Sequence, residues 1–146
     1  QANLVIAGRN ESAGQAVCDR LGPRSQFYPF DLTQAQALDT AIAAVDLVIH
    51  CAGPFHYRDT SVLQTCIRHR VNYVDVSDHP SFTRKVRECS PQAQAAGVTA
   101  IVNTGVFPGI SNSMVRYDVE HLDTADSIHL SYVVAGSGGA GVTVMR

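Results

Sequence analysis

The chain has 146 residues, of which 45% are hydrophobic and 16% charged, and its formal net charge is −2. This size and balance are those of a globular domain with a buried core, and they give no electrostatic reason to expect a nucleic-acid partner. Because no apolar run reaches the roughly 18 residues that a membrane-spanning helix needs, we expect no membrane span.

Short apolar runs alternate with longer helical patterns along the chain. The expected order is strand 3–8, helix 11–22, strand 25–31, helix 34–45, strand 46–53, helix 60–70, strand 71–78, helix 80–96, strand 98–105, helix 108–122 and strand 127–136. Asn10 and Gly22 are placed to cap and close the first helix, and Thr33 can cap the second. Pro91 is expected to interrupt the helix at 80–96.

Apolar strands that alternate with helices predict an α/β fold, a doubly wound and mostly parallel Rossmann-like sheet covered on both faces. The run at 127–136 instead alternates apolar and polar residues, which is typical of a sheet with one wet face. We therefore expect a Rossmann-like domain at 1–123 and the start of a second, α+β sheet domain at 124–146. Pairing of the last strand between two copies would give a homodimer.

The segment GSGGAG at 136–141 has the spacing G-x-G-x-x-G, which in nucleotide-binding proteins opens a helix whose N-terminus holds a pyrophosphate. Only VTVMR follows it, and this stretch is β-branched and too short to form that helix. A loop that joins strands is therefore the expected role of the segment.

Four cysteines, at 18, 51, 66 and 89, form no C-x-x-C pair, and the six histidines form no metal-binding cluster. We therefore predict reduced thiols and no metal. Cytoplasm is the default compartment, and an organelle stays open because the N-terminus is not informative.

Arg9 follows the first strand directly. Where a dinucleotide fold reads the adenosine ribose, an acidic residue binds a 2′-hydroxyl group, whereas arginine pairs with a 2′-phosphate. Gly8, Arg9 and Asn10 thus predict a strand end that binds NADP, with NAD as the alternative. A solvated arginine at a strand–helix corner would have the same spacing. Asp31 and Leu32 end the next strand, where the Asp31 carboxylate can accept from an adenine amino group or cap a helix.

The third strand runs into the segment CAGPF at 51–55. Small Ala52 and Gly53 let a cofactor approach the backbone, Pro54 fixes the turn and Phe55 offers a ring face. We predict that this segment, Cys51 included, binds the cofactor. A Gly-Pro turn followed by a core phenylalanine is the other interpretation.

With these residues in place, the chain resembles the NAD(P)-binding domain of the saccharopine dehydrogenase-like family. The resemblance covers about residues 3–122 and runs through AGR (7–9), CAGPFHY (51–57), VLQTCIRHRVNYVDVSD (62–78) and AAGVTAIVNTGVFPGISN (95–112). The family's first strand, first helix and glycine-rich loop would precede residue 1. The resemblance thus implies that the domain is incomplete at its N-terminus.

The resemblance implies a two-domain NAD(P)-dependent oxidoreductase that transfers hydride to or from a small-molecule substrate. Arg9 matches the family's 2′-phosphate position, Asp31 an adenine-side position, and residues 52–54 the turn against the cofactor. The chemistry of the transfer belongs to the cofactor, which the protein positions.

On the substrate side, the resemblance implies Tyr57 and Asp75 as catalytic candidates for the proton donor. His79 and residues outside this chain are the alternative donors. The expected substrate-side residues are His79, Thr104, Gly105 and Phe107. Amino-acid-forming members of the family carry Asp where this chain has Phe107, which argues against an amino-dicarboxylate substrate.

Two other functions compete with this interpretation. A non-catalytic nucleotide-binding or assembly module could keep the fold without the reaction, because fold alone does not imply activity. A short-chain reductase would need a Tyr-x-x-x-Lys pair, and none of the tyrosines at 28, 57, 73, 117 and 132 has Lys four residues later.

Overall fold

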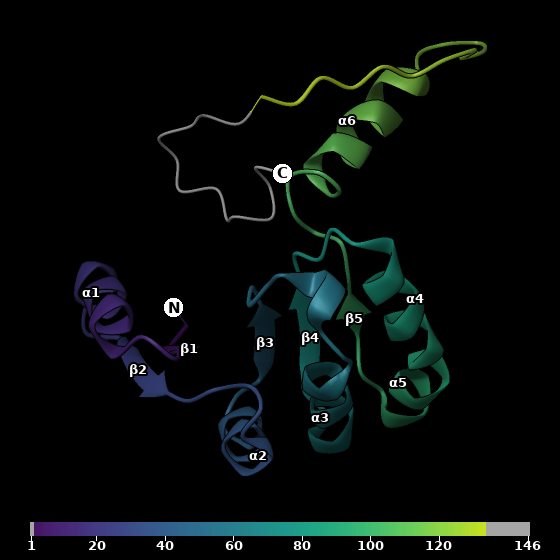
Figure 1. Ribbon diagram of the computed structural model, residues 1–146. Coiled ribbons are helices and arrows are strands. Elements are labelled where there is room, and N and C mark those ends of the chain that lie inside the picture. Colours follow the sequence, from purple (N-terminus) through teal and green to yellow (C-terminus); the bar gives the residue numbers. More distant parts are fainter. Residues whose placement is uncertain (1, 134–146) are drawn as a thin grey trace.

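The computed structural model describes residues 2–133, in which strands and helices alternate as the sequence predicts (Figure 1). The elements are β1 (Leu4–Gly8), α1 (Glu11–Leu21), β2 (Ser25–Pro29), α2 (Ala35–Ala43), β3 (Leu47–His50), the 3-10 turn η1 (Phe55–Tyr57), α3 (Ser61–His69), β4 (Asn72–Asp75), α4 (Pro80–Glu88), α5 (Ser90–Ala96), β5 (Ala100–Ile101) and α6 (Ile110–Val119). The predicted α/β class is confirmed.

Within residues 2–133 the strand pairs are all parallel, and they form two sheets, β1–β2 and β3–β4–β5. Gly8 pairs with Pro29 in the first sheet and His50 with Asp75 in the second. These four residues end their strands, so the carboxyl ends within each sheet lie level. Within each sheet, the loops that follow are therefore gathered along one edge, where ligands of parallel sheets bind.

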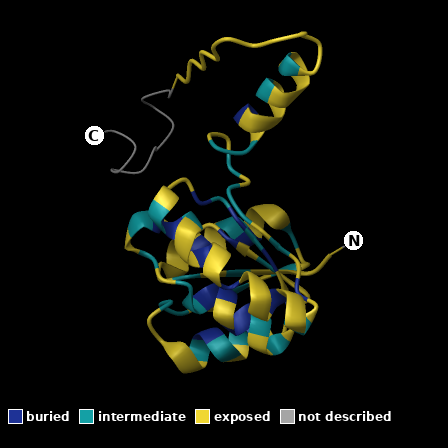
Figure 2. Cartoon of the chain, turned by 90° about the vertical axis from the view of Figure 1, so that its right-hand side faces the viewer, coloured by how far each residue is buried: buried dark blue, intermediate teal, exposed yellow. Residues whose placement is uncertain are grey.

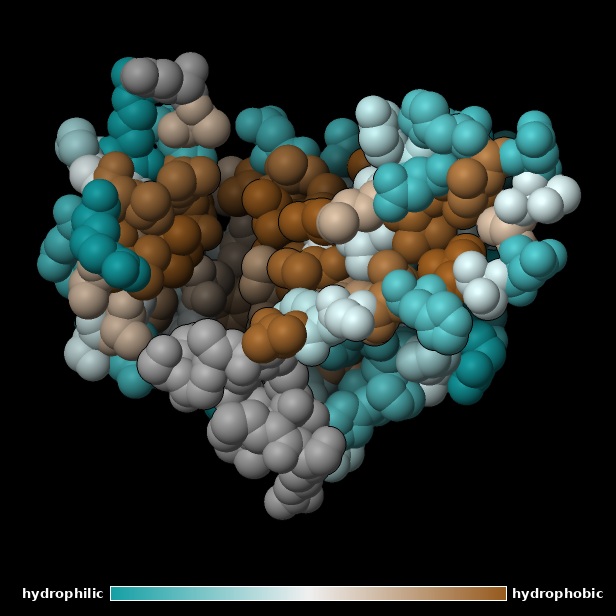
Figure 3. Space-filling view, turned by 90° about the horizontal axis from the view of Figure 1, so that it is seen from above, coloured by the Kyte–Doolittle hydropathy of each residue, from teal (hydrophilic) through white to brown (hydrophobic). Residues whose placement is uncertain are grey.

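A hollow separates the part made of α1, β1 and β2 from the rest of the molecule. Seen from above, apolar side chains gather on both sides of it (Figure 3). Among the described residues, β1 and β3 each pair with one strand only. Leu4 and Val5 of β1 and Leu47 and Ile49 of β3 are among the large apolar residues that stay exposed. The sequence did not predict this division of the sheet.

The core lies where α2, α3 and α4 pack against the β3–β4–β5 sheet, and it includes Tyr73 and Phe82. In Figure 2 the buried residues are concentrated in this region, whereas α6 stands apart and is mostly exposed. Within residues 2–133, none of the helices combines the length and the apolar character needed to cross a membrane.

The first helix begins and ends as predicted. Asn10 Oδ1 accepts from the Ala13 N–H at 3.0 Å, and Gly22 closes the helix at a φ of 87°. Gly14 lies against the ring of Phe27, because a Cβ added there would come within 2.0 Å of Phe27 Cε2. Glycine thus lets α1 pack directly on β2, which fixes the loop between β1 and α1.

The break in the helix predicted at 80–96 is confirmed. One helix ends at Glu88 and the next begins at Ser90, with Pro91 in its first turn, where a missing N–H costs nothing. The predicted cap of α2 is wrong. The Thr33 hydroxyl donates to Asp31 Oδ1 at 2.9 Å, and the N-cap is Gln34, without a side-chain cap bond.

The strand predicted at 127–136 does not form over residues 127–133. No strand of the described chain pairs with this segment, and its apolar Ile128, Leu130 and Tyr132 remain exposed. Alternation alone does not stabilise a strand, because its backbone groups need a partner. Residues 134–136 and the glycine-rich segment 136–141 lie outside the described residues. The start of a second domain at 124 stays a prediction.

Candidate functional site

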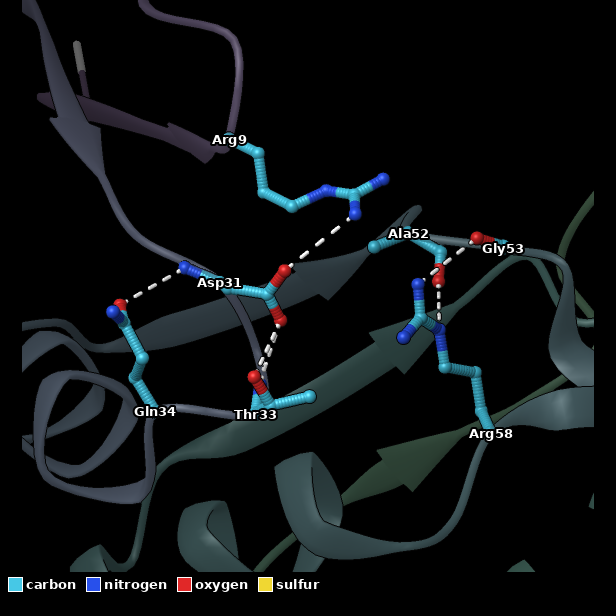
Figure 4. Close-up of polar contacts among 7 residues, drawn as sticks. All are labelled: Arg9, Asp31, Thr33, Gln34, Ala52, Gly53 and Arg58. Carbon is cyan, nitrogen blue, oxygen red and sulfur yellow. Dashed lines mark hydrogen bonds and ion pairs between the residues drawn. The ribbon is translucent and has the colours of Figure 1, made fainter.

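Arg9 and Asp31 follow two paired strands and form an ion pair (Figure 4). Arg9 Nη1 lies 3.6 Å from Asp31 Oδ2, and the two side chains are 79% and 33% exposed. Water screens a pair at this exposure, so it orients the guanidinium without occupying its other N–H donors. Arg9 therefore presents a cation at the end of β1 that can pair with an anionic ligand.

The turn that follows β2 holds the Asp31 carboxylate in place. Asp31 Oδ1 accepts from the backbone N–H and the hydroxyl of Thr33, each at 2.9 Å. The Asp31 N–H in turn donates to Gln34 Oε1 at 3.2 Å. These Thr33 hydrogen bonds, and after them the charge of Arg9, lower the pKa of Asp31. The carboxylate is therefore ionised at neutral pH.

The other predicted residues at these two strand ends are held by the fold. The Gly8 carbonyl accepts from the Phe30 N–H at 3.1 Å, and Asn10 caps α1. Leu32 packs against the core. Gly8, Arg9 and Asn10 also line a shallow pocket over β1 and the first turn of α1. The structure thus brings these three residues to one surface and directs Leu32 toward the interior.

The turn after β3 is braced by an arginine that sequence reasoning missed. Arg58 Nε donates to the Ala52 carbonyl at 2.8 Å, and Nη2 donates to the Gly53 carbonyl at 3.1 Å (Figure 4). Cys51 and Pro54, on either side of these carbonyls, are exposed. A lone arginine in a loop carries no periodic pattern, so no signal in the sequence singles it out.

Phe55 belongs to the core. It is 4% exposed, and its ring lies 5.1 Å from those of both His50 and Phe82, measured between ring centroids. This burial matches the second interpretation of the CAGPF segment and leaves no free ring face for a cofactor. Phe55 instead anchors the turn from beneath.

Asp75 ends β4 and is fully buried. Its Oδ1 accepts from the Ser77 N–H at 3.0 Å, the Ser77 hydroxyl at 2.6 Å and the Asn103 N–H at 3.0 Å. Its Oδ2 accepts from the Tyr73 hydroxyl at 3.0 Å. The carboxylate thus ties the loop after β4 to the loop after β5. Its role as a proton donor stays a prediction, which this enclosure does not favour.

His50 ends β3 and joins the same buried group. Its Nδ1 lies 2.9 Å from the Tyr73 hydroxyl oxygen. Because the only hydroxyl proton of Tyr73 goes to Asp75, Nδ1 must carry a proton and donate. Burial lowers the pKa of His50 and so keeps the ring neutral. The pKa of Tyr73 is raised, first by burial and then by the Asp75 charge.

Tyr57 and His79 lie in an exposed group of aromatic rings beside the turn after β3. The ring of His56 lies 3.7 Å from that of Tyr57 and 5.5 Å from that of His79, between centroids. Tyr57 is 80% exposed. His79 caps α4, with its Nδ1 accepting from the Ser81 N–H at 3.3 Å. Of the two predicted catalytic residues, Tyr57 is therefore the accessible one.

The loop at 103–109 is fixed by backbone contacts. The hydroxyl and the N–H of Thr104 both donate to the Asp75 carbonyl, at 2.7 and 3.0 Å. Gly105 and Gly109 form a bridge, and Gly109 has a φ of 133°. A Cβ on Gly109 would lie 1.9 Å from the Gly105 oxygen, so this close approach requires glycine.

A groove runs between this loop and α6. Both polar and apolar side chains line it, and among them are Asn103, Thr104, Ile110, Asn112, Ser113 and Tyr117. Phe107 lies outside this lining; it is 48% exposed and stacks on the ring of Tyr132 at 5.7 Å. Thr104 is thus the predicted substrate-side residue that the groove includes. Sequence reasoning missed the contribution of α6.

Some of the predicted cofactor residues lie near one another, namely Arg9, Asp31, Ala52 and Gly53, whereas Leu32 and Phe55 belong to the interior. Figure 4 shows Arg9, Asp31 and the Ala52–Gly53 turn in a single close-up. The two Thr33 hydrogen bonds, and after them the charges of Arg9 and Arg58, lower the pKa of Asp31. Residues predicted to bind the two halves of the cofactor therefore lie on one surface, the shared rim, which consists of Arg9, Asp31 and the Ala52–Gly53 turn.

The remaining reactive groups do not form a second centre in the described chain. Cys18, Cys66 and Cys89 are buried and Cys51 is exposed. Burial raises the pKa of Cys66 to about 12. Among residues 2–133, no group of three or more His, Cys, Asp or Glu side chains is placed to hold a metal ion.

Comparison with known proteins identifies relatives along most of the chain. It is 29% identical over 122 residues to carboxynorspermidine synthase of Vibrio alginolyticus, which covers 72% of this chain and 29% of that protein. It is 24% identical over 115 residues to a saccharopine dehydrogenase-like oxidoreductase of Bos taurus, covering 78% of this chain and 27% of the relative. The chain thus spans less than a third of the length of these relatives.

The fold has a counterpart of known structure. Saccharopine dehydrogenase (L-Glu forming) from Saccharomyces cerevisiae matches with a TM-score of 0.66 and 27% identity, over 82% of this chain and 25% of that one. The family model described as saccharopine dehydrogenase NADP binding domain matches residues 1–101. By this match, and by the parallel α/β fold that carries it, the chain belongs to the family of saccharopine dehydrogenase NADP-binding domains.

Proposed function

We propose that this chain is the NADP-binding part of an oxidoreductase that acts on a small-molecule substrate. The observation that carries the proposal is the exposed guanidinium of Arg9 at the carboxyl end of β1, in a family of NADP-binding domains. An arginine at this strand end suits a 2′-phosphate, which NADP has and NAD lacks. We therefore propose that the chain binds NADP in preference to NAD.

Three groups of residues would hold NADP along the shared rim. Arg9 would pair with the 2′-phosphate, and Asp31 would lie on the adenine side. The turn at Ala52, Gly53 and Pro54 would lie against the nicotinamide, where exposed small residues let a ring approach the backbone. The cofactor supplies the hydride chemistry, and these residues bind and orient it.

The substrate would bind between the turn after β3 and the groove beside α6. Tyr57 is the proton donor of this proposal because its side chain is exposed beside the turn. His79 would contact the substrate on the same side as Tyr57, because the ring of His56 lies against the rings of both residues. Thr104 would present the loop backbone at Gly105 to the substrate. Phe107 would add an apolar surface at the border of the groove, as its exposure allows.

The proposal is tested by titrating the protein with NADPH and with NADH while following nicotinamide fluorescence. We expect NADPH to bind at least about tenfold more tightly than NADH, and Arg9→Met to remove this difference. Arg20→Met is the matched control, because Arg20 is exposed in the last turn of α1, at the end away from Arg9. NADPH binding that is unchanged in Arg9→Met would contradict the assignment, and so would an equal loss in Arg20→Met.

A further inference from the structure

Arg58 connects two parts of the turn after β3 through one rigid group. It follows η1 directly, and its side chain reaches back to the Ala52 and Gly53 carbonyls at 2.8 and 3.1 Å. These carbonyls belong to consecutive residues, and a guanidinium is a planar fork with donors at fixed angles. The two bonds together fix the orientation of the peptide planes in this turn.

The backbone of the loop is fixed independently of this brace. The Arg58 N–H donates to the Phe55 carbonyl at 3.0 Å, and Lys85 Nζ donates to the Arg58 carbonyl at 3.4 Å. Phe55 is buried against Phe82 of α4. These contacts fix the backbone of Arg58 relative to the core. The guanidinium at the other end of the side chain in turn fixes the exposed Ala52–Gly53 turn.

Figure 4 shows the Arg58 guanidinium directed at the Ala52–Gly53 turn and the Arg9 guanidinium directed at Asp31. The two arginines make different contacts. Arg9 pairs with a carboxylate just after β2, whereas Arg58 donates its side-chain hydrogen bonds to the backbone carbonyls of Ala52 and Gly53. The Arg9 guanidinium is thus accessible to an anionic ligand, whereas the Arg58 guanidinium stabilises the conformation of the turn.

We propose that Arg58 is a positioning residue, which holds the Ala52–Gly53 turn in the shape that the nicotinamide half of the cofactor requires. The inference rests on the proposed function, in which this turn lies against the nicotinamide and Arg9 against the 2′-phosphate. It follows that Arg58 affects binding of the whole cofactor and not binding of its adenosine half alone.

Two ligands separate the halves of the site. NADPH contacts both halves, whereas adenosine 2′,5′-bisphosphate contains the 2′-phosphate but no nicotinamide. Their affinities are measured by isothermal titration calorimetry for the wild type, Arg58→Met, Arg58→Lys and Arg9→Met. Arg58→Met keeps a long side chain and removes every donor. Arg58→Lys keeps the charge but loses the fork that reaches two adjacent carbonyls.

We expect Arg58→Met to weaken NADPH about tenfold and to leave the bisphosphate within about twofold of the wild type. Arg58→Lys should resemble Arg58→Met, because charge without the fork does not restore the turn. Arg9→Met should weaken both ligands. Thermal unfolding of each variant establishes that it is folded, and Arg58→Gln, which keeps one donor group, replaces any variant that is not.

Three outcomes would overturn the inference. One is an Arg58→Met variant that binds NADPH like the wild type. Another is an equal loss for both ligands, which would make Arg58 part of a general positive field. The third is full recovery in Arg58→Lys, which would assign the effect to charge. A wild type that binds neither ligand would refute the proposed function itself, and this result is distinct from the other three.

Discussion

Arg9 Nη1 lies 3.6 Å from Asp31 Oδ2, so the cation proposed to bind a 2′-phosphate already faces a carboxylate. The pKa of that carboxyl is lowered, first by its two hydrogen bonds from Thr33 and then by Arg9, so the carboxylate stays charged at neutral pH. A phosphate that approaches Arg9 would therefore meet an attractive and a repulsive charge at once.

Replacing Asp31 by Asn should tighten NADPH binding by about three- to tenfold, because it removes the repulsive charge and keeps an oxygen acceptor. NADH should bind as before, since it has no 2′-phosphate. Fluorescence titration at low and high salt checks this, and the gain should shrink as salt screens the charges. Asp19→Asn, at the far end of α1, is the control. Weaker NADPH binding in Asp31→Asn would contradict this expectation, because the charge of Asp31 would then favour the cofactor.

Cys51 should be the cysteine that reacts first with iodoacetamide in the folded protein. It is exposed at the start of the turn, whereas Cys66 is buried with its pKa raised to about 12, which suppresses its thiolate. Saturating NADPH should slow alkylation of Cys51 by about fivefold or more, because the cofactor would cover the turn. Mass spectrometry of peptides over time measures both rates. An alkylation rate unaffected by NADPH would place the nicotinamide away from Cys51.

Asp75→Asn should lower the free energy of unfolding by about 2–4 kcal/mol, since the amide turns an N–H₂ group toward donors that now bind a buried carboxylate. Four donors converge on this carboxylate, from Tyr73, Ser77 and Asn103. Urea unfolding gives the change. Asp46→Asn, on an exposed residue ahead of β3, should change stability by less than about 0.5 kcal/mol. Equal stabilities in the two variants would mean that the network contributes little.

His50 should make the fold less stable in acid. Burial lowers its pKa in the folded chain, while in the unfolded chain it takes up a proton near its ordinary value of about 6.5. Below that pH the unfolded state binds more protons, so the free energy of unfolding falls as pH drops through about 6.5 toward the folded pKa. His50→Asn keeps an N–H donor near Tyr73 and cannot titrate. Its stability should therefore fall less between pH 7 and pH 5, measured by urea unfolding; equal slopes would contradict this.

Local patterns predicted most elements because each is decided within a few residues. The Asn10 cap, the Gly22 stop and the break at Pro91 follow from backbone chemistry at single positions, and the structure confirms them. Thr33 was misread because its hydroxyl has two partners within reach, and Asp31 is the one that it binds. The strand expected at 127–136 depended on a neighbour that the sequence of the segment cannot provide.

The candidate site was partly predictable for the same reason. Strand ends that finish in Gly8 or in Ala52–Gly53 are visible in the sequence, so the rim could be located. The group formed by His50, Tyr73 and Asp75 could not, because it joins side chains from two strands. The role of Arg58 could not be predicted, because its contacts with two carbonyls depend on the conformation of the loop. Such a conformation produces no periodic pattern in the sequence.

The division into two small parallel sheets has a practical consequence. In the described chain, β1 and β3 each keep one side of the backbone without a hydrogen-bonded strand, next to exposed Leu4, Val5, Leu47 and Ile49. Such ribbons are templates onto which other extended chains add, and apolar residues make the addition favourable. The chain should therefore aggregate as its concentration rises, and static light scattering measures this. Ile49→Asp or Ile49→Lys should reduce the aggregation, because a charge on β3 disfavours pairing with another strand.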